Sequence, residues 1–576
     1  MVSQEIRDLK KELLKKKLLE MDKKYDENAG LLGEMKYEES VIHSKVTGMV
    51  HGTGINREYV LFVFMTETEE RYERAIGILK KLSALQDKNP ESRTCGLWPY
   101  YMEESLEDMK APDYNFAEFV GSTFIYIMKE KRHLIDDALA GEIEEVLRLA
   151  AHCCVRRNVG VDYTNACCMS VYTIIAAAEI LKDDYLFEKG KAELIHFVEY
   201  TRFNGAFSEY NSPCYIQVAA DSIAKMQMYF EDEECRKMAD ELNEYLWEMC
   251  ASQYSTGFNL LTPPYTRVYE DIDEKEIPFF VYLATEGRYG SKTDALCIYH
   301  LYDISCPEKY YPLFEKTGWV NKTYYKKNNL REAEEDLTIV RDLESPDLTV
   351  YSYITDDYLF GSLQKSELWV QRRTLMTVWD NDNKKALKLC GLKNNFGFSS
   401  AMSYVAQNKN KAVALVGFCT DHGDKHYILD LFKDGKLKAQ SLVFKLQLSG
   451  GYEGLRFKEE NGMYVLSDGD FRICVKVEKW VYDGKEAEVR IADDGLELVC
   501  FSGEEREVDF NKLGETYGVL SYAINEKPAG IAVEAKDGKI RIVSENAEYE
   551  ITGTAVPKTY NECMRGTEVI VNDKAE

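Results

Sequence analysis

The sequence predicts an α+β multidomain protein in which an N-terminal (α/α) toroid, or incomplete barrel of helical hairpins, precedes a C-terminal antiparallel β-sandwich. The 576 residues exceed what one ordinary hydrophobic core holds. Apolar residues recur at helical spacing in the first part of the chain and at a spacing of two in the second. We therefore expect a toroid domain at residues 1–335 and a sandwich domain at residues 336–576.

Helical hairpins account for the first part. Residues 165–182 have apolar side chains at helical spacing, a short turn follows, and residues 186–202 repeat the pattern. The leucines of residues 1–24 have the same spacing, which favours a capping helix packed on the body over a membrane-surface helix. Further segments of this kind are 70–85, 115–130, 135–154, 216–230 and 233–250.

Short strands account for the second part. Residues 348–354, 441–448, 471–482, 487–492, 496–501 and 540–545 alternate apolar and polar side chains or are rich in β-branched residues. Asp-Gly or Asn-Gly pairs, which favour tight hairpins, stand at 434–435, 461–462, 483–484, 494–495 and 537–538. The pattern predicts an antiparallel sheet domain of many strands.

Composition limits the partners. A net charge of −27 argues against nucleic acid, and against a long polyanion unless local arginines reverse the field. The opening residues lack an apolar signal segment and no run of about 20 apolar residues occurs, so we expect a cytoplasmic protein without a membrane partner. The 15 cysteines form no CxxC pair, and no metal or phosphate motif appears; we expect reduced thiols and no cofactor. The composition is compatible with either a monomer or a homo-oligomer.

Loops rich in aromatic and polar residues separate the predicted helices. They cover residues 95–115, 156–165, 203–215 and 259–273. In an array of antiparallel helix pairs, the loops at one end gather around the axis, so these loops are expected to line one cleft.

Four strings resemble the heparinase II/III-like polysaccharide lyases, in a poorly characterised bacterial and fungal subgroup. They are WPYYMEESLEDMKAPDYNFAEF (98–119), RRNVGVDYTN (156–165), FSEYNSPCY (207–215) and LWVQRRTLMTVWD (368–380). The resemblance implies a toroid joined to a β-sandwich and cleavage of a uronic-acid-containing oligosaccharide by β-elimination. One departure is Tyr265, near which relatives are expected to have a histidine.

Elimination removes the C5 proton of a uronic acid once hydrogen bonds neutralise its carboxylate, and tyrosine can serve as base, acid or both. A structural role is the alternative for several candidates, because Asn211 and Ser212 can cap a helix and His152 lies on a helix that looks buried. His51 is the next histidine candidate. The candidates are Tyr210 and Tyr215 for proton transfer, with Glu209 beside them, Asn165 and Asn211 for the carboxylate, and His152, Arg157 or Arg267 for charge stabilisation.

A glycoside hydrolase is the alternative, using two carboxyl groups roughly 5 to 9.5 Å apart. Loop carboxylates available for it, or for substrate contact, are Glu103, Glu104, Asp113, Asp162, Glu209, Asp271 and Asp273. Solvated turns explain Glu103 and Glu104 equally well, and helix capping explains Asp162. Arg372 and Arg373, next to Trp369, are expected to form structural salt bridges.

Aromatic side chains in the loops either stack against sugar rings or pack in the hydrophobic core. Trp98, Tyr100 and Tyr101 are the main candidates, and Tyr163 and Tyr265 stand in the other loops. Two further hypotheses remain, a non-catalytic glycan-binding protein and non-carbohydrate chemistry that requires an accessible Cys167 or Cys168.

Overall fold

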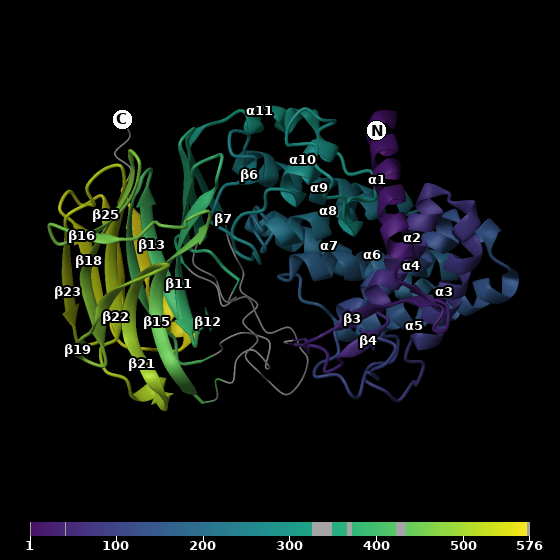
Figure 1. Ribbon diagram of the computed structural model, residues 1–576, viewed down its shortest axis with the longest axis horizontal. Coiled ribbons are helices and arrows are strands. Elements are labelled where there is room, and N and C mark those ends of the chain that lie inside the picture. The colour runs from purple at the N-terminus through teal and green to yellow at the C-terminus, as the bar shows by residue number, and fades with distance from the viewer. Residues whose placement is uncertain are drawn as a thin grey trace. The chain divides into compact units, whose positions relative to one another are not determined.

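The computed structural model describes residues 2–40, 42–324, 348–365, 371–421, 432 and 434–572 (Figure 1). The chain divides into two compact units. Unit 1 comprises Met1–Phe203, Tyr215–Trp247 and Lys275–Pro307, and unit 2 comprises Asn204–Cys214, Glu248–Glu274 and Glu308–Glu576. The predicted boundary at residues 335 and 336 lies outside the described residues. Two loop segments of the helical half nevertheless belong to unit 2, because they bond to its strands, as the bridge between Tyr265 and Arg373 shows.

The helices of the described residues include the predicted ones, with ends shifted by a few residues. They are α1 (Gln4–Asp22), α2 (Thr53–Thr66), α3 (Tyr72–Leu85), α4 (Asn115–Glu130), α5 (Asp137–Arg157), α6 (Thr164–Leu181), α7 (Asp184–Asn204), α8 (Pro213–Tyr229), α9 (Glu233–Gln253), α10 (Glu276–Ala284), α11 (Tyr311–Phe314) and α12 (Tyr560–Gly566). Helices α2, α10, α11 and α12 were not predicted from the sequence, although ten residues of α2 are buried.

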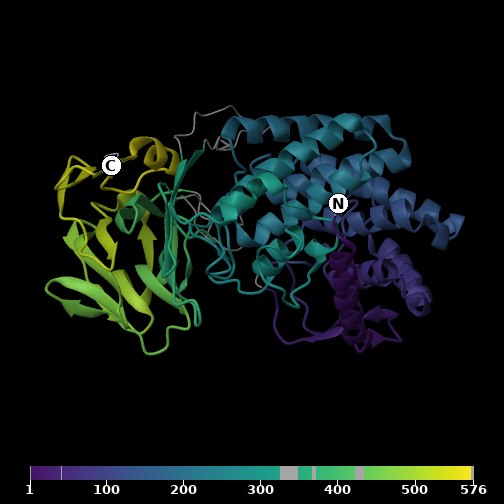
Figure 2. The same cartoon turned by 90° about the horizontal axis from the view of Figure 1, so that it is seen from above.

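Helices of unit 1 form the two rows of a toroid (Figure 2). Successive helices pack as hairpins, α2 with α3 and α4 with α5, while α2, α4 and α6 contact one another as an inner row and α3 contacts α5 in an outer row. Inner helices are apolar on most sides, as expected of helices enclosed by neighbours. Helix α6 is long and apolar enough to cross a membrane, yet 83% of that stretch is buried inside the fold.

Helix α1 packs on the body, as predicted. Ser3 caps it by accepting a hydrogen bond from the Ile6 amide, and its buried face includes Leu13, Leu14 and Leu18. It contacts α2. The apolar stripe seen in the sequence therefore covers the first hairpin.

Two large antiparallel sheets form the sandwich of unit 2, within the described residues. The nine-stranded sheet has the order β20-β21-β15-β11-β10-β9-β8-β7, with β12 paired to β11, and the seven-stranded sheet has the order β13-β14-β22-β18-β17-β16, with β19 paired to β18. Residues of both sheets share one apolar core, in which the Phe360 and Tyr522 rings stack at 5.2 Å. The predicted β-sandwich is confirmed.

The strand bounds are as follows. The nine-stranded sheet contains β7 (Gly318–Tyr324), β8 (Leu348–Ile354), β9 (Tyr358–Leu363), β10 (Leu375–Trp379), β11 (Lys385–Lys393), β12 (Phe396–Gly397), β15 (Lys436–Gly450), β20 (Val489–Ala492) and β21 (Gly495–Asp509). The seven-stranded sheet contains β13 (Ala401–Asn408), β14 (Lys411–Phe418), β16 (Lys458–Glu460), β17 (Met463–Asp468), β18 (Phe471–Tyr482), β19 (Lys485–Glu486) and β22 (Tyr517–Ile524).

Smaller sheets complete both units. A four-stranded sheet contains β23 (Ile531–Lys536), β24 (Lys539–Ser544), β25 (Tyr549–Thr554) and β26 (Glu568–Val571). Two-stranded pairs are β1 (Tyr25–Asp26) with β2 (Leu31–Leu32), β3 (Glu34–Lys36) with β4 (Gly48–Val50), and β5 (Tyr254–Ser255) with β6 (Leu260–Leu261).

Hairpin turns follow the predicted dipeptides. Asn461 and Gly462 join β16 to β17 with φ of 52° and 75°, and Asp483 and Gly484 join β18 to β19 with φ of 51° and 74°. Positive φ at both central residues is the geometry that matches the twist of paired strands. The turn chemistry alone thus placed these hairpins.

Candidate active site

The loop before α8 is anchored by a buried ion pair. Arg267 Nη1 lies 2.6 Å from Glu209 Oε1, and each side chain is 5% exposed. Arg267 also donates from Nε to Gln371 Oε1 at 2.9 Å. Two ionised groups withdrawn from water need such close pairing, so Glu209 and Arg267 fix each other within unit 2.

Tyr210 is held at both ends. Its hydroxyl accepts a hydrogen bond from Gln253 Nε2 at 3.0 Å, and its carbonyl accepts one from Thr266 Oγ1 at 2.7 Å. The residue is 2% exposed, and burial raises the pKa of the phenol to about 12. Tyr210 is therefore a neutral, enclosed side chain in this structure.

Asn211 has a backbone conformation that non-glycine residues seldom adopt, with φ of 50°. Its Nδ2 donates to the carbonyls of Thr262 at 2.7 Å and Pro264 at 2.8 Å. Both amide hydrogens are thus spent on the backbone, which leaves none for a substrate carboxylate. The carboxylate-binding role predicted for Asn211 does not fit this geometry, and its structural alternative does.

Ser212 completes the set, because its hydroxyl donates to the Arg267 carbonyl at 2.5 Å. We call residues 209–212 and their partners Gln253, Thr262, Pro264, Thr266 and Arg267 the anchored loop. These residues belong to unit 2, and Glu209 to Ser212 are at most 7% exposed.

A second ionic group continues from the anchored loop along the strands. Asp271 pairs with Arg373 at 2.5 Å and with Lys388 at 2.6 Å. Burial opposes ionisation of Asp271, but the two cations together lower the pKa of its carboxyl below the usual value. The predicted structural salt bridge of Arg373 is present.

Tyr265 is enclosed as well. Its main chain pairs with that of Arg373, its hydroxyl donates to the Leu261 carbonyl at 2.5 Å, and the residue is 2% exposed. Burial raises the pKa of its phenol. Tyr265 offers no surface for a sugar, so its predicted substrate contact is wrong for this conformation.

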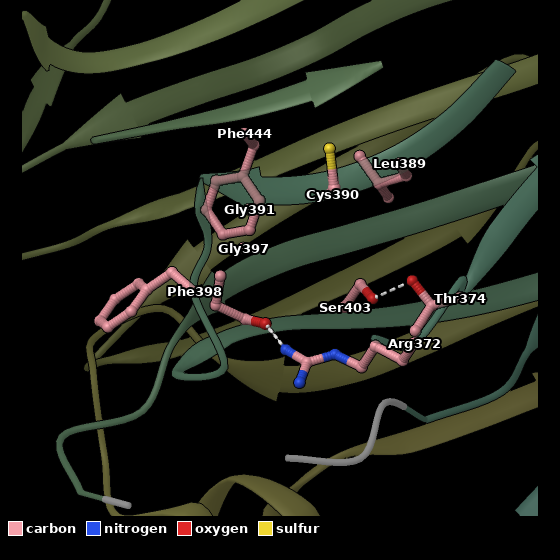
Figure 3. A pocket seen from close by; sticks show the side chains of 10 residues that line it. Arg372, Thr374, Leu389, Cys390, Gly391, Gly397, Phe398, Ser403 and Phe444 are labelled. Carbon is pink, nitrogen blue, oxygen red and sulfur yellow. Dashed lines mark hydrogen bonds between the residues drawn. The ribbon is translucent and has the colours of Figure 1, made fainter. Parts of the chain in front are cut away.

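Arg372 points into a small pocket of the sandwich (Figure 3). It donates from Nη2 to the carbonyls of Ser399, at 2.9 Å, and Ala401, while Thr374 and Ser403 share a 2.7 Å hydrogen bond beside it. The segment before β10 is thereby bonded to the start of β13; these partners are backbone carbonyls and are not the salt bridge that was predicted for Arg372. Trp369 lies outside the described residues.

Tyr215 differs from Tyr210 in exposure. It stands in the first turn of α8, three residues after Ser212, and is only half-buried. Asn165 occupies the matching first turn of α6 and is buried, at 3%. Tyr163 is at the N-cap position of α6 and makes no side-chain capping hydrogen bond, and Asp162 precedes it by one residue.

Arg157 is fixed between two side chains of α4. It donates to Glu118 Oε1 and to Asn115 Oδ1, each at 2.9 Å. His152, one turn earlier on α5, is half-buried and packs on the Tyr185 ring at 6.1 Å. Burial lowers the pKa of His152, which keeps the imidazole neutral at neutral pH.

The aromatic residues that were predicted to contact sugar differ in exposure. Trp98 is 0% exposed and donates from Nε1 to the Leu82 carbonyl at 2.7 Å, so the predicted sugar contact is wrong for this residue. Tyr100 and Tyr101 are half-buried; the Tyr100 hydroxyl donates to Asp113 Oδ2 at 2.8 Å, and Lys36 lies 4.6 Å from the Tyr101 ring centre. These two tyrosines remain candidates for sugar contact.

His51 lies between two carboxylates. Its Nδ1 is 2.5 Å from Glu103 Oε1, and its Nε2 is 3.3 Å from Asp26 Oδ2. Glu104, in contrast, is buried and accepts from the Lys45 amide at 2.8 Å. The solvated-turn interpretation is therefore wrong for Glu104, and an imidazole separates Glu103 from Asp26.

Other expectations are resolved by burial. Cys167 and Cys168 are 0% exposed, which removes the hypothesis that needs an accessible thiol there. No group of three or more histidine, cysteine or acidic side chains able to hold a metal occurs within the described residues.

Several residues in or next to the anchored loop were not predicted from the sequence. Gln253, Thr266 and Gln371 each orient a predicted residue. Gln253 ends a helix and Gln371 precedes a strand, positions without a local signal, so only the folded chain reveals their partners.

A family model described as Domain of unknown function (DUF8769) matches residues 11–285. No curated protein matches the sequence.

Among solved structures, heparinase III is similar at 8% identity and a TM-score of 0.40, over 87% of this chain and 82% of that chain. Chondroitin AC lyase of Streptomyces coelicolor A3, in complex with chondroitin sulphate, is similar at 9% and 0.41, over 87% and 79%. The heparan sulfate lyase HepC from Pedobacter heparinus is similar at 9% and 0.31, over 91% and 82%.

Proposed function

We propose that this protein cleaves a uronic-acid-containing oligosaccharide by β-elimination, with Tyr215 as the proton-transfer residue. The observation that carries the proposal is the anchored loop. It ends directly before α8 and holds the first turn of that helix, where Tyr215 stands half-buried.

The conformation of the anchored loop costs more free energy than an ordinary structural turn requires. It contains a buried ion pair and a non-glycine residue at positive φ, and such features persist where the surroundings determine one geometry. Rigid support of this kind is what a reacting side chain requires, because small misplacements reduce catalysis strongly.

Tyr215 is a better candidate than Tyr210 because of access. The Tyr210 hydroxyl already accepts a hydrogen bond from Gln253, and the residue is 2% exposed. A base or acid must reach the proton that it transfers, to within hydrogen-bond distance. We assign Tyr210 to the support of the loop and Tyr215 to the chemistry.

The experiment follows ultraviolet absorbance of the unsaturated uronate during incubation with a panel of uronic-acid oligosaccharides. The wild type should generate absorbance, and Tyr215→Phe should lower the rate by about 10²- to 10⁴-fold, the usual contribution of a general acid or base. Tyr210→Phe is the matched control, and it should retain more activity than Tyr215→Phe.

A reducing-end assay on the same samples separates the alternatives. New reducing ends without absorbance would refute elimination and support a hydrolase. Binding of the oligosaccharides without any cleavage would support the non-catalytic glycan-binding hypothesis. Equal loss in both tyrosine variants would contradict the assignment of Tyr215.

A further inference from the structure

Helices α2, α4, α6 and α8 of unit 1 line a polar crevice that has no part in the anchored loop. The crevice is lined by Arg57 from α2, Glu118 from α4, Tyr172 from α6, and Asp221 and Lys225 from α8. Four of these five side chains carry a formal charge, in the middle of a helical core. A cluster of this kind is expensive to bury and calls for a physical reason.

The charged groups are only partly matched. Lys225 Nζ lies 2.6 Å from Asp221 Oδ2 and 4.9 Å from the centre of the Tyr302 ring. Glu118 pairs through Oε1 with Arg157 at 2.9 Å. Each carboxylate therefore has one oxygen engaged by a cation.

Four other polar atoms of the crevice have no hydrogen-bond partner among the described residues. Glu118 Oε2, Asp221 Oδ1, the Tyr172 hydroxyl and Thr173 Oγ1 make no hydrogen bond in the described part of the chain. These residues are 1%, 4%, 1% and 0% exposed, in that order. Buried polar groups are nearly always bonded, so their convergence on one space indicates a site for a polar group.

Helical register links the crevice to the proposed catalytic end of unit 1. Tyr172 follows Asn165 by seven residues on α6, and the crevice residue Ser222 follows Tyr215 by seven residues on α8. Residues seven apart share a helix face about two turns from each other. The crevice thus lies on the helix faces that carry Asn165 and Tyr215.

The size of the crevice limits what enters it. Its floor has room for about one water molecule, which is space for a single functional group. The half-buried side chains of Phe119, Ile298 and Tyr299 form its more exposed part. A ligand would insert one group and leave its remaining atoms against these side chains.

The hydrogen-bonding capacity of the unpartnered atoms favours a hydroxyl group as the ligand. Glu118 Oε2 and Asp221 Oδ1 require a donor, whereas the Tyr172 hydroxyl can donate to an acceptor. A sugar hydroxyl both donates and accepts. A carboxylate or sulfate has no hydrogen to donate to these two oxygens, so it would leave both without a partner. We propose that the crevice binds a hydroxyl group of a neutral sugar; as a subsite for the neutral residue of the oligosaccharide, it rests on the proposed function.

Ligand-observed NMR titrations test this without turnover. The probes are methyl α-glucopyranoside and glucuronate, each added to the whole protein. The glucoside should bind, and glucuronate should bind at least tenfold more weakly. Tyr172→Phe should weaken glucoside binding by about three- to tenfold, as expected for one lost hydrogen bond, without lowering the thermal midpoint.

Tyr302→Phe is the matched control. The Tyr302 hydroxyl is also buried without a partner, but it does not line the crevice, so this variant should bind the glucoside like the wild type. The inference is overturned if the glucoside does not bind, if glucuronate binds equally well, or if Tyr172→Phe leaves binding unchanged. Glucoside binding together with no elimination product would sink the proposed function while leaving the crevice as a sugar site.

Discussion

The anchored loop of unit 2 and the polar crevice of unit 1 both bury charged side chains, but they differ in how those charges are satisfied. In the anchored loop, Arg267 donates to both Glu209 and Gln371, and the loop atoms without a partner, Asn211 Oδ1 and Thr262 Oγ1, are neutral. In the crevice, the carboxylates of Glu118 and Asp221 each keep an oxygen without a partner. The comparison indicates that closely paired buried charges serve to hold a shape, whereas a buried carboxylate with an open oxygen is placed to receive a donor.

Replacing Arg267 with Met would break the anchored loop most strongly. The change leaves Glu209 buried and unpaired, so we expect the free energy of unfolding to fall by about 3–5 kcal/mol. Urea unfolding followed by circular dichroism measures it. The double variant Glu209→Leu/Arg267→Met should recover most of the loss, because no lone charge remains. A loss under about 1 kcal/mol in the single variant would show that the pair is not a support.

Asn211→Ala tests the strained turn. Alanine tolerates positive φ poorly and cannot donate to Thr262 and Pro264, so stability should fall by about 2–4 kcal/mol. Asn211→Gly separates the effect of backbone strain from that of the lost hydrogen bonds. Glycine adopts positive φ without strain, but it lacks the side-chain amide just as alanine does. Equal stability of the two variants would mean that the conformation of residue 211 contributes nothing.

Acid sensitivity should depend on Asp271. Its folded-state pKa is below the unfolded value, so the stabilisation is fully present above the unfolded pKa and is lost as the pH falls through the folded pKa. Stability measured from neutral to acidic pH should therefore decline less steeply in Asp271→Asn, which starts from a lower value. Parallel curves for the variant and the wild type would contradict this assignment.

Tyr172→Phe should have the smallest effect on stability. The hydroxyl it removes makes no hydrogen bond, so the free energy of unfolding should stay within about 0.5 kcal/mol of the wild type or rise. Differential scanning calorimetry of the ligand-free protein measures it. A loss above about 1 kcal/mol would show that the hydroxyl is already satisfied in the free protein, and the contrast between the two regions would disappear.

Prediction from sequence succeeded where local signals are strong. Residues 115–130 were predicted as a helix and form α4, and residues 471–482 form β18. The periodicity of apolar side chains carries this information because a helix and a strand repeat every 3.6 and two residues. Positive-φ dipeptides such as Asn461-Gly462 added the hairpin turns.

The candidate site was predicted only as a set of residue types. Glu209 and Arg267 were both named, but not as partners, and Tyr210 ranked beside Tyr215. Exposure separates the two tyrosines, and exposure depends on what the rest of the chain places over a residue. Trp98 illustrates the same limit, because a tryptophan beside a proline packs or binds sugar according to its neighbours.

By itself the sequence determined that helical hairpins precede antiparallel strands, because these elements depend on residues close together along the chain. Tertiary structure alone decided that residues 204–214 and 248–274 join the sandwich unit, that Gln253 holds Tyr210, and that Glu118, Tyr172 and Asp221 converge on one crevice. The physical reason is that ion pairs and hydrogen bonds act between side chains brought together from distant positions. The periodicity of apolar residues indicates which face of an element is buried, but it does not indicate which side chains that face contacts.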